Sequence, residues 1–135
     1  MSKRSLIFFA FLFGVLLSHA QKDMKLPTVK LPVFKKDTFS ISRYGAKGDG
    51  SFLNTLAIQK AIDACHTKGG GVVLLPAGLW LSGPLTIKSN VNLHLATGST
   101  LLFTKDFDQF PMVKANWEGL PQMRNQSPIS ATDAN

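Results

Sequence analysis

The chain has 135 residues, a formal net charge of +7 at pH 7, 44% hydrophobic residues and one cysteine. The single cysteine excludes an intramolecular disulfide, and the length suits one small domain rather than several. Seven of the fifteen basic residues precede residue 37, and the remainder is nearly balanced in charge, so basicity gives no reason to expect a nucleic-acid-binding surface on the domain.

Residues 1–20 are typical of a signal peptide. A positively charged start is followed by an uninterrupted apolar run at residues 6–17 and by the small residues Ser18 and Ala20, where a signal peptidase would cleave. We therefore expect cleavage before Gln21 and an exported protein, periplasmic or extracellular. A spanning helix needs about 20 apolar residues, so an uncleaved anchor is the weaker alternative, and no stable membrane span is expected after cleavage.

Residues 21–37 form a leader rich in lysine and proline. Proline disfavours helix and favours extended backbone, so we interpret this segment as a basic linker or a strap along the domain, which we place at residues 38–135. A short strand is predicted at residues 39–41. The three glycines within residues 44–50 then predict a turn, in which Asp49 hydrogen-bonds to its own backbone.

One amphipathic helix follows this turn. Asn54 is a favourable N-cap, and Gly69 is suited to the left-handed residue that ends a helix. Between them lies a single apolar stripe, made of Ala57, Ile58, Ala61, Ile62 and Cys65. A single stripe covers a single apolar surface, so we expect this helix to cap a β structure and Cys65 to be a buried structural thiol.

Short apolar segments separated by small turns come next, at residues 72–75, 79–81, 85–87, 91–95 and 101–103. An offset of twenty residues aligns parts of this region with itself: Val73 with Leu93, Leu75 with Leu95, Gly78 with Gly98, and Leu81 with Leu101. Such recurrence is typical of solenoid coils. A β-sandwich or meander is the competing fold, but the capping helix and the lack of Asn-Gly or Asp-Gly turns favour a solenoid.

Residues 104–135 show no usable periodicity and predict either an irregular functional loop or the approach to structure that the chain lacks. Asp106 and Asp108 are interpreted as solvated loop residues rather than a catalytic pair. His94 alternates to the polar face of its strand, and no second ligand stands two or four residues away. We expect neither a metal nor a cofactor.

Several motifs resemble a known family. FxIxxYGAxGDG at residues 39–50, NTxAIQxAI at 54–62 and GGGVV with PAG at 69–78 resemble the N-terminal cap of the pectate-lyase-like superfamily. LSGPL at 81–85, KSNVNL at 88–93, NWEG at 116–119 and SPI at 127–129 resemble glycoside hydrolase family 28, the polygalacturonases. The resemblance implies an all-β fold, a right-handed parallel β-helix (solenoid) with an N-terminal capping α-helix, of which only the first coils are present.

The resemblance also implies a secreted enzyme that hydrolyses galacturonic-acid linkages of pectin or rhamnogalacturonan with inversion. Two carboxyl groups about 6.5–9.5 Å apart serve such a mechanism. The family's catalytic Asn-Thr-Asp, Asp-Asp, Gly-His-Gly and Arg-Ile-Lys motifs do not occur here, and Asp133 lacks the preceding asparagine. We therefore expect no catalytic residue in this fragment, no activity and, because its last coil would expose an open edge, poor solubility.

Trp117, Glu118 and Arg124 are the candidate substrate-binding residues, because a tryptophan can stack on a sugar ring and the two charged residues can line a cleft. The expected partner is an acidic plant-type polysaccharide, with no nucleic acid, and we expect a monomer. Two other function classes stay open on the same fold: a polysaccharide lyase or epimerase, and a non-catalytic sugar-binding or adhesive β-helix.

Overall fold

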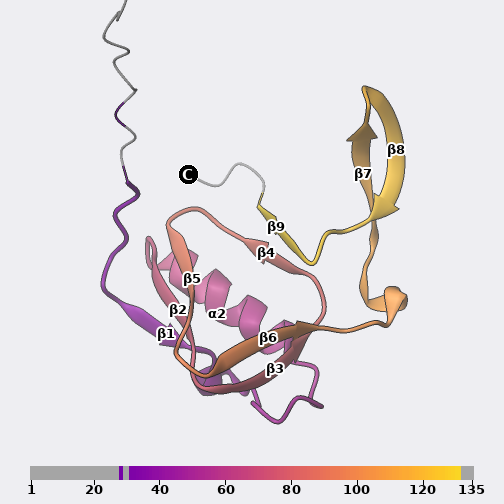
Figure 1. Cartoon of the computed structure of the whole chain (residues 1–135). Helices are drawn as coiled ribbons and strands as arrows, with labels where there is room; N and C mark the ends of the chain where they lie inside the picture. Colours follow the sequence, from indigo (N-terminus) through magenta and orange to yellow (C-terminus); the bar gives the residue numbers. More distant parts are fainter. Residues whose placement is uncertain (1–27, 29–30, 132–135) are drawn as a thin grey trace, which may run out of the picture. The chain divides into compact units, whose positions relative to one another are not determined.

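The computed structural model describes residue 28 and residues 31–131. The chain divides into two units, Met1–Pro32 and Val33–Asn135, and the elements below belong to the second (Figure 1). The expected signal peptide, most of the leader and Asp133 lie outside the described residues. The elements are β1 (Thr38–Ser40), η1 (Ile41–Tyr44), α2 (Thr55–Thr67), β2 (Gly71–Leu75), β3 (Gly78–Ser82), β4 (Leu85–Ile87), β5 (Val91–Leu95), β6 (Ser99–Phe103), η2 (Phe107–Gln109), β7 (Met112–Trp117), β8 (Leu120–Asn125) and β9 (Ile129–Ala131).

The strands stack as successive coils of a right-handed parallel β-helix, as the sequence predicted. β1, β2 and β5 form one parallel sheet, β3 pairs with β6, and β4 pairs with β9. Each pairing joins a strand to the equivalent strand one coil further along the chain, so the strands trace the sides of a single winding (Figure 1). The sandwich and meander alternatives are wrong, because each of these pairs is parallel.

The predicted offset of twenty residues holds for one side of the coil and fails for the next. Val73 pairs with Leu93 as expected, whereas Trp80, not Leu81, pairs with Leu101. The reason is the turn between β5 and β6, which is one residue longer than the turn between β2 and β3. Gly98 absorbs the extra residue at a φ of +80° and accepts a hydrogen bond from Gly78 N at 3.0 Å.

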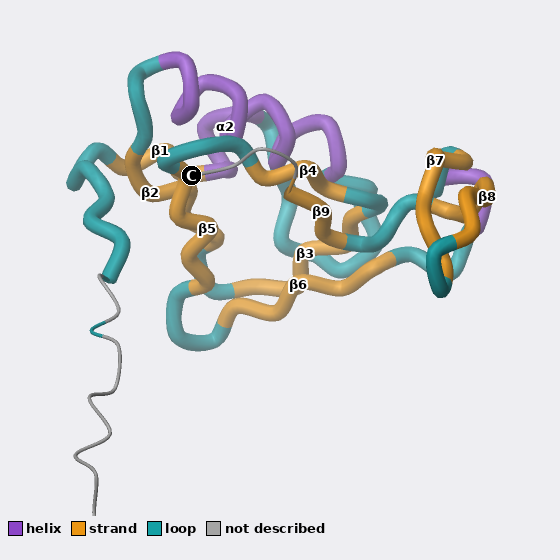
Figure 2. Tube along the Cα trace, turned by 90° about the horizontal axis from the view of Figure 1, so that it is seen from above, coloured by secondary structure: helices purple, strands orange, loops and turns teal. Residues whose placement is uncertain are grey.

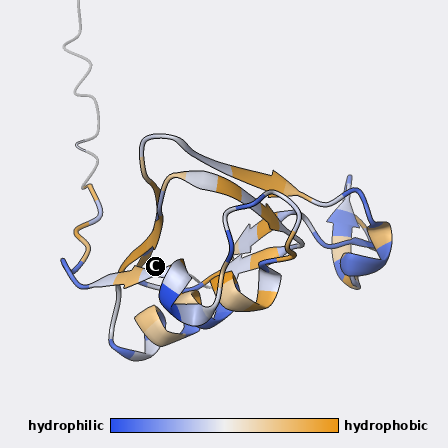
Figure 3. Ribbon diagram, turned by 90° about the horizontal axis from the view of Figure 1, so that it is seen from below, coloured by the Kyte–Doolittle hydropathy of each residue, from blue (hydrophilic) through white to orange (hydrophobic). Residues whose placement is uncertain are grey.

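The capping helix lies across one end of the stack, next to β1, β2 and β4 (Figure 2). The predicted stripe is buried in full, from Ala57 to Cys65. It packs against inward residues of the strands, among them Val73, Leu75 and Leu85, all fully buried. Figure 3 colours the coil strands as mainly apolar and the helix as part apolar, part hydrophilic. Burying each large aliphatic side chain here contributes about 1.5–3 kcal/mol to the free energy of folding. The helix thus stabilises the domain by covering the apolar end of the coils.

Asn54 is the N-cap residue of α2, as predicted, but its side chain makes no capping hydrogen bond. The side chain of Asn54 is fully buried. Its Oδ1 accepts a hydrogen bond from Lys47 N at 2.7 Å. Its Nδ2 donates to the carbonyl oxygens of Lys47, Phe52 and Leu81 at 3.0, 2.8 and 3.2 Å. Asn54 thus ties the glycine-rich turn to β3. It satisfies buried backbone groups rather than the free amides of the helix.

The glycine-rich turn itself behaves as the sequence predicted. The Asp49 carboxylate accepts from Ser51 N, Ser51 Oγ and Phe52 N at 2.8, 3.0 and 2.8 Å. These bonds, led by that from the Phe52 amide, lower the pKa of Asp49. Asp49 is also in parallel bridge with Leu79. The turn is therefore a structural device that delivers the helix onto the first coil.

The end of the leader contacts the cap. Lys35 Nζ donates to the carbonyl oxygen of Lys68 at 3.2 Å, where a cation complements the negative end of the α2 dipole. The carbonyl oxygen of Asp37 accepts from Val72 N at 2.8 Å. In the part of the chain that the structure describes, no helix has the length and apolar character needed to cross a membrane.

Candidate functional site

The candidate binding residues stand on an antiparallel hairpin, β7–β8, which projects from the coils (Figure 1). The expectation of an irregular segment after residue 104 is therefore wrong. Trp117 pairs with Leu120 across a two-residue turn, Glu118-Gly119, in which both residues have positive φ, 49° and 85°. Two positive φ values in a two-residue loop match the twist of a hairpin. A glutamate in the first of these positions is the reason that no hairpin was expected here.

The hairpin brings two of the three candidate residues together. Alternation along the strands puts Trp117 of β7 and Arg124 of β8 on the same face, and Arg124 Cζ lies 5.6 Å from the centre of the Trp117 ring. Trp117 remains 55% exposed. A cation over an indole at an exposed site contributes about 0.5–1 kcal/mol. The pair is thus a partly exposed indole with a positive charge held over one face of its ring.

Glu118 lies at the tip of the hairpin and is not part of this pair. Its carboxylate has no hydrogen bond or ion pair within the described residues, and its left-handed backbone is unusual for a residue other than glycine. The turn, rather than a substrate, accounts for its position. Of the three predicted binding residues, the structure therefore groups Trp117 with Arg124 and leaves Glu118 apart.

A hollow of about 350 Å³ on the hairpin has a further basic residue in its lining. It is lined by Lys114, Ala115, Pro121, Gln122 and Met123. Every residue of β8 is exposed, and so are Lys114 and Asn116 of β7. The alternation that puts Trp117 and Arg124 on one face puts Lys114 on the other, so the two positive charges belong to opposite faces of the hairpin.

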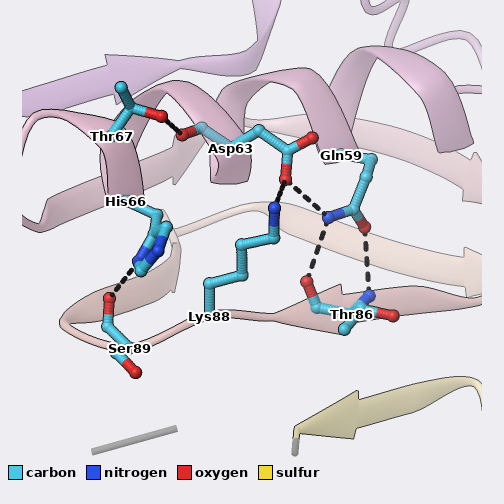
Figure 4. A network of polar contacts seen from close by, with 7 residues as sticks. All are labelled: Gln59, Asp63, His66, Thr67, Thr86, Lys88 and Ser89. Atoms are coloured by element: carbon cyan, nitrogen blue, oxygen red, sulfur yellow. Dashed lines mark hydrogen bonds and ion pairs between the residues drawn. The ribbon is translucent and has the colours of Figure 1, made fainter.

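The acidic residue of α2 serves the fold. Asp63 on α2 accepts from Lys88 Nζ at 2.8 Å and from Gln59 Nε2 at 3.1 Å (Figure 4). The bond from Lys88 is the main cause of the lowered pKa of Asp63. Gln59 also donates to and accepts from the backbone of Thr86, so this cluster fastens the helix to β4.

Asp106 and Asp108 lie in a turn, as the sequence predicted. Asp106 precedes η2 and its carboxylate accepts from Asp108 N at 3.1 Å and from Gln109 Nε2 at 3.2 Å. His94 is exposed on β5, also as predicted. Cys65 is fully buried, and desolvation raises the pKa of its thiol.

The described residues thus place an exposed tryptophan and an arginine together on the hairpin. Within residue 28 and residues 31–131 there is no group of three or more side chains placed to hold a metal ion. Sequence reasoning missed one feature, a cavity at the base of the hairpin that Lys105, Phe107 and Phe110 help to line. The close spacing of phenylalanines from residue 103 to 110 is the signal that could have found it.

Comparison with known proteins places these features in context. Residues 38–127 match the family model described as rhamnogalacturonase A/epimerase, pectate lyase-like. The chain is 44% identical over 96 residues to exo-poly-α-D-galacturonosidase of Dickeya chrysanthemi, covering 71% of this chain and 16% of the relative. It is 36% identical over 78 residues to a probable polygalacturonase of Vitis vinifera, covering 56% and 16%. It is 51% identical over 61 residues to mannuronan C5-epimerase AlgE3 of Azotobacter vinelandii, covering 39% and 3%.

Two solved structures are similar over most of the chain. The exopolygalacturonase of Thermotoga maritima superposes with a TM-score of 0.72 at 29% identity, covering 78% of this chain and 24% of that protein. The family 28 exopolygalacturonase of Yersinia enterocolitica gives 0.67 at 39% identity, covering 75% and 18%. The chain therefore spans 16% or less of the length of the curated relatives named above.

Proposed function

Because the chain belongs to the rhamnogalacturonase A/epimerase, pectate lyase-like family, we propose that it is the N-terminal part of an exported glycoside hydrolase that cleaves galacturonic-acid linkages of pectin or rhamnogalacturonan. The similarity to a galacturonosidase across most of the described domain is the observation that carries the proposal. The likeness to two exopolygalacturonase structures supports it independently.

In this proposal the Trp117–Arg124 pair binds a uronate ring. The exposed indole offers an apolar face to the C–H groups of the sugar, and the guanidinium, 5.6 Å from the ring centre, offers donors to its carboxylate. A neutral sugar would use the indole alone. The pair therefore favours acidic polymers over neutral ones, consistent with the expected acidic polysaccharide partner.

The chemical step belongs to residues that this chain does not supply. Hydrolysis with inversion needs a carboxylic acid to protonate the leaving oxygen and a carboxylate to activate water from the other side. In the described part of the chain, the carboxylates of Asp49, Asp63 and Asp106 are all held in hydrogen bonds that serve turns and the helix. We propose that these 135 residues bind uronide but do not hydrolyse it.

The second candidate function is epimerisation or β-elimination of a uronide polymer. The 51% identity to a mannuronan C5-epimerase favours it, and the family description names an epimerase as well. That similarity covers 39% of this chain and 3% of the epimerase. It therefore supports the shared fold more directly than a shared reaction.

Product analysis with the parent protein, meaning the proposed longer hydrolase of which this chain is the N-terminal part, tests the proposal. The parent protein is incubated with polygalacturonate and, separately, with polymannuronate. We expect new reducing ends from polygalacturonate without the ultraviolet absorbance of an unsaturated uronide. Unsaturated products would indicate a lyase, a change of sugar configuration without cleavage would indicate an epimerase, and either result would contradict the proposal.

A further inference from the structure

The leader carries a short repeat that the proposed function does not use. Lys-Leu-Pro occurs at residues 25–27 and again at 30–32, five residues later, and Lys35 follows after another five. Residues 21–37 contain five lysines against two aspartates. Charge alone keeps a linker solvated, so the recurring leucine indicates a second property, contact with an apolar surface.

The end of this leader is held on the domain. Lys35 Nζ donates to the carbonyl oxygen of Lys68 at 3.2 Å, and the carbonyl oxygen of Asp37 accepts from Val72 N at 2.8 Å. Lys35, Lys36 and Lys68 are all exposed and form one basic cluster at the C-terminal end of α2, with Asp37 as the acidic residue beside it. An ammonium group has three donors, so Lys35 can bind an anion while it keeps its bond to Lys68.

Exposed aliphatic side chains precede the basic cluster in the sequence. Leu31 is 82% exposed and Val33 is 95% exposed. Single exposed aliphatic residues are normal on a protein surface, but here two of them stand within five residues of two lysines. Moving such side chains out of water is favourable, and these two retain almost all of their surface for a partner to cover.

The combination of cations and aliphatic side chains points to one class of partner. A dissolved polyanion would use the lysines and leave Leu31 and Val33 in water, and a purely apolar partner would leave the lysines unpaired. The surface of a bilayer with anionic phospholipid uses both, because its headgroups attract lysines and its interface admits aliphatic side chains. The leader also directly follows the expected signal peptide, so it is the part of the mature chain nearest the membrane at cleavage.

We propose that residues 31–36, together with Lys68, dock the exported protein on an anionic phospholipid surface. The docking is peripheral and reversible: the lysines supply attraction to the headgroups, and Leu31 and Val33 enter the interface. Two weak signals acting together give stable surface binding where either alone is marginal. This inference concerns where the protein is held and does not depend on the reaction that the parent protein catalyses.

Co-sedimentation of the mature parent protein, beginning at Gln21, with lipid vesicles tests the proposal. We expect binding to vesicles of phosphatidylglycerol and phosphatidylcholine, little binding to phosphatidylcholine alone, and weaker binding at high salt. Lys36→Gln should weaken binding about fivefold, as for one lysine near an anionic surface. Val33→Ser should weaken it roughly three- to tenfold, because the valine side chain then has less apolar surface to remove from water. Lys114→Gln, which removes an exposed lysine from β7, is the matched control and should leave binding unchanged.

The two variants separate charge from insertion. Equal binding to both kinds of vesicle, or unchanged binding in Lys36→Gln, would overturn the basic cluster as a docking surface. A loss in Lys36→Gln without a loss in Val33→Ser would overturn the bilayer as the partner, since a dissolved polyanion would give that result. Binding to neither kind of vesicle would contradict this inference and leave the proposed function standing. Both side chains are exposed, so neither substitution should impair folding.

Discussion

Replacing Asn54 by alanine should destabilise the domain more than any exposed substitution, because this buried amide serves four backbone groups at once. Truncation leaves the amide of Lys47 without its 2.7 Å acceptor, and an unpaired buried donor costs about 1–3 kcal/mol. The three lost bonds from Nδ2 add about 1 kcal/mol in net terms, since the carbonyls can find other donors. The expected loss in the free energy of unfolding is about 2–4 kcal/mol.

Thermal unfolding followed by circular dichroism measures this loss. A domain of this size loses about 4–8 °C in Tm for each kcal/mol, so Asn54→Ala should lower the Tm by at least about 8 °C. Asn116→Ala is the control, because Asn116 is exposed on β7 and surface changes stay within about 0.5 kcal/mol. A fall in Asn54→Ala no larger than in the control would refute the idea that this side chain ties the turn to β3.

Three further outcomes follow from the structure. Trp117→Ala should weaken binding of polygalacturonate, measured by affinity electrophoresis, without changing the Tm; unchanged binding would make Trp117 a packing residue. The pKa of Asp63 is lowered in the folded state, so its ion pair with Lys88 should stabilise the domain above the unfolded pKa of about 3.9 and lose this contribution as the pH falls through the folded pKa. Lys88→Met should therefore lower the free energy of unfolding by about 0.2–1 kcal/mol at pH 7 and have no effect at a pH where the carboxyl group is protonated. Urea unfolding at these two pH values measures the difference. Gly70→Ala should lower the Tm more than Gly45→Ala. Both glycines have positive φ, but a Cβ at Gly70 would lie 2.5 Å from a backbone oxygen of the turn before β5, whereas a Cβ at Gly45 would have nothing within 4 Å. Equal losses of Tm would mean that backbone strain alone causes both effects.

The coil and its cap were predictable because they depend on patterns that a sequence carries directly. The apolar stripe from Ala57 to Cys65 has helical spacing, and burial of that stripe follows from the spacing. The twenty-residue offset predicted the pairing of β2 with β5. It missed the register of β3 with β6 by one residue, because the length of a turn is set by backbone geometry around Gly98 rather than by apolar spacing.

The candidate site was predictable only in part. The sequence singled out Trp117 and Arg124, but seven positions separate them, and only the antiparallel pairing of β7 with β8 brings them together. The turn that makes this pairing contains Glu118 at positive φ, a residue that local propensity does not favour there. The cavity near Lys105 is lined by one segment that follows β6 and one that leads to β9; the phenylalanines of the first segment are visible in the sequence, but only the fold brings the second segment beside them.

The stereochemistry of the first product tests the central claim most directly. Proton NMR of the parent protein acting on polygalacturonate, recorded within the first minutes, shows which anomer is released before mutarotation. The account predicts a saturated galacturonic-acid product of β configuration, because the relative acts on an α-linked polymer and hydrolysis by the proposed route inverts the anomeric centre. A first product of α configuration, an unsaturated uronide or an epimerised but uncleaved polymer would contradict it.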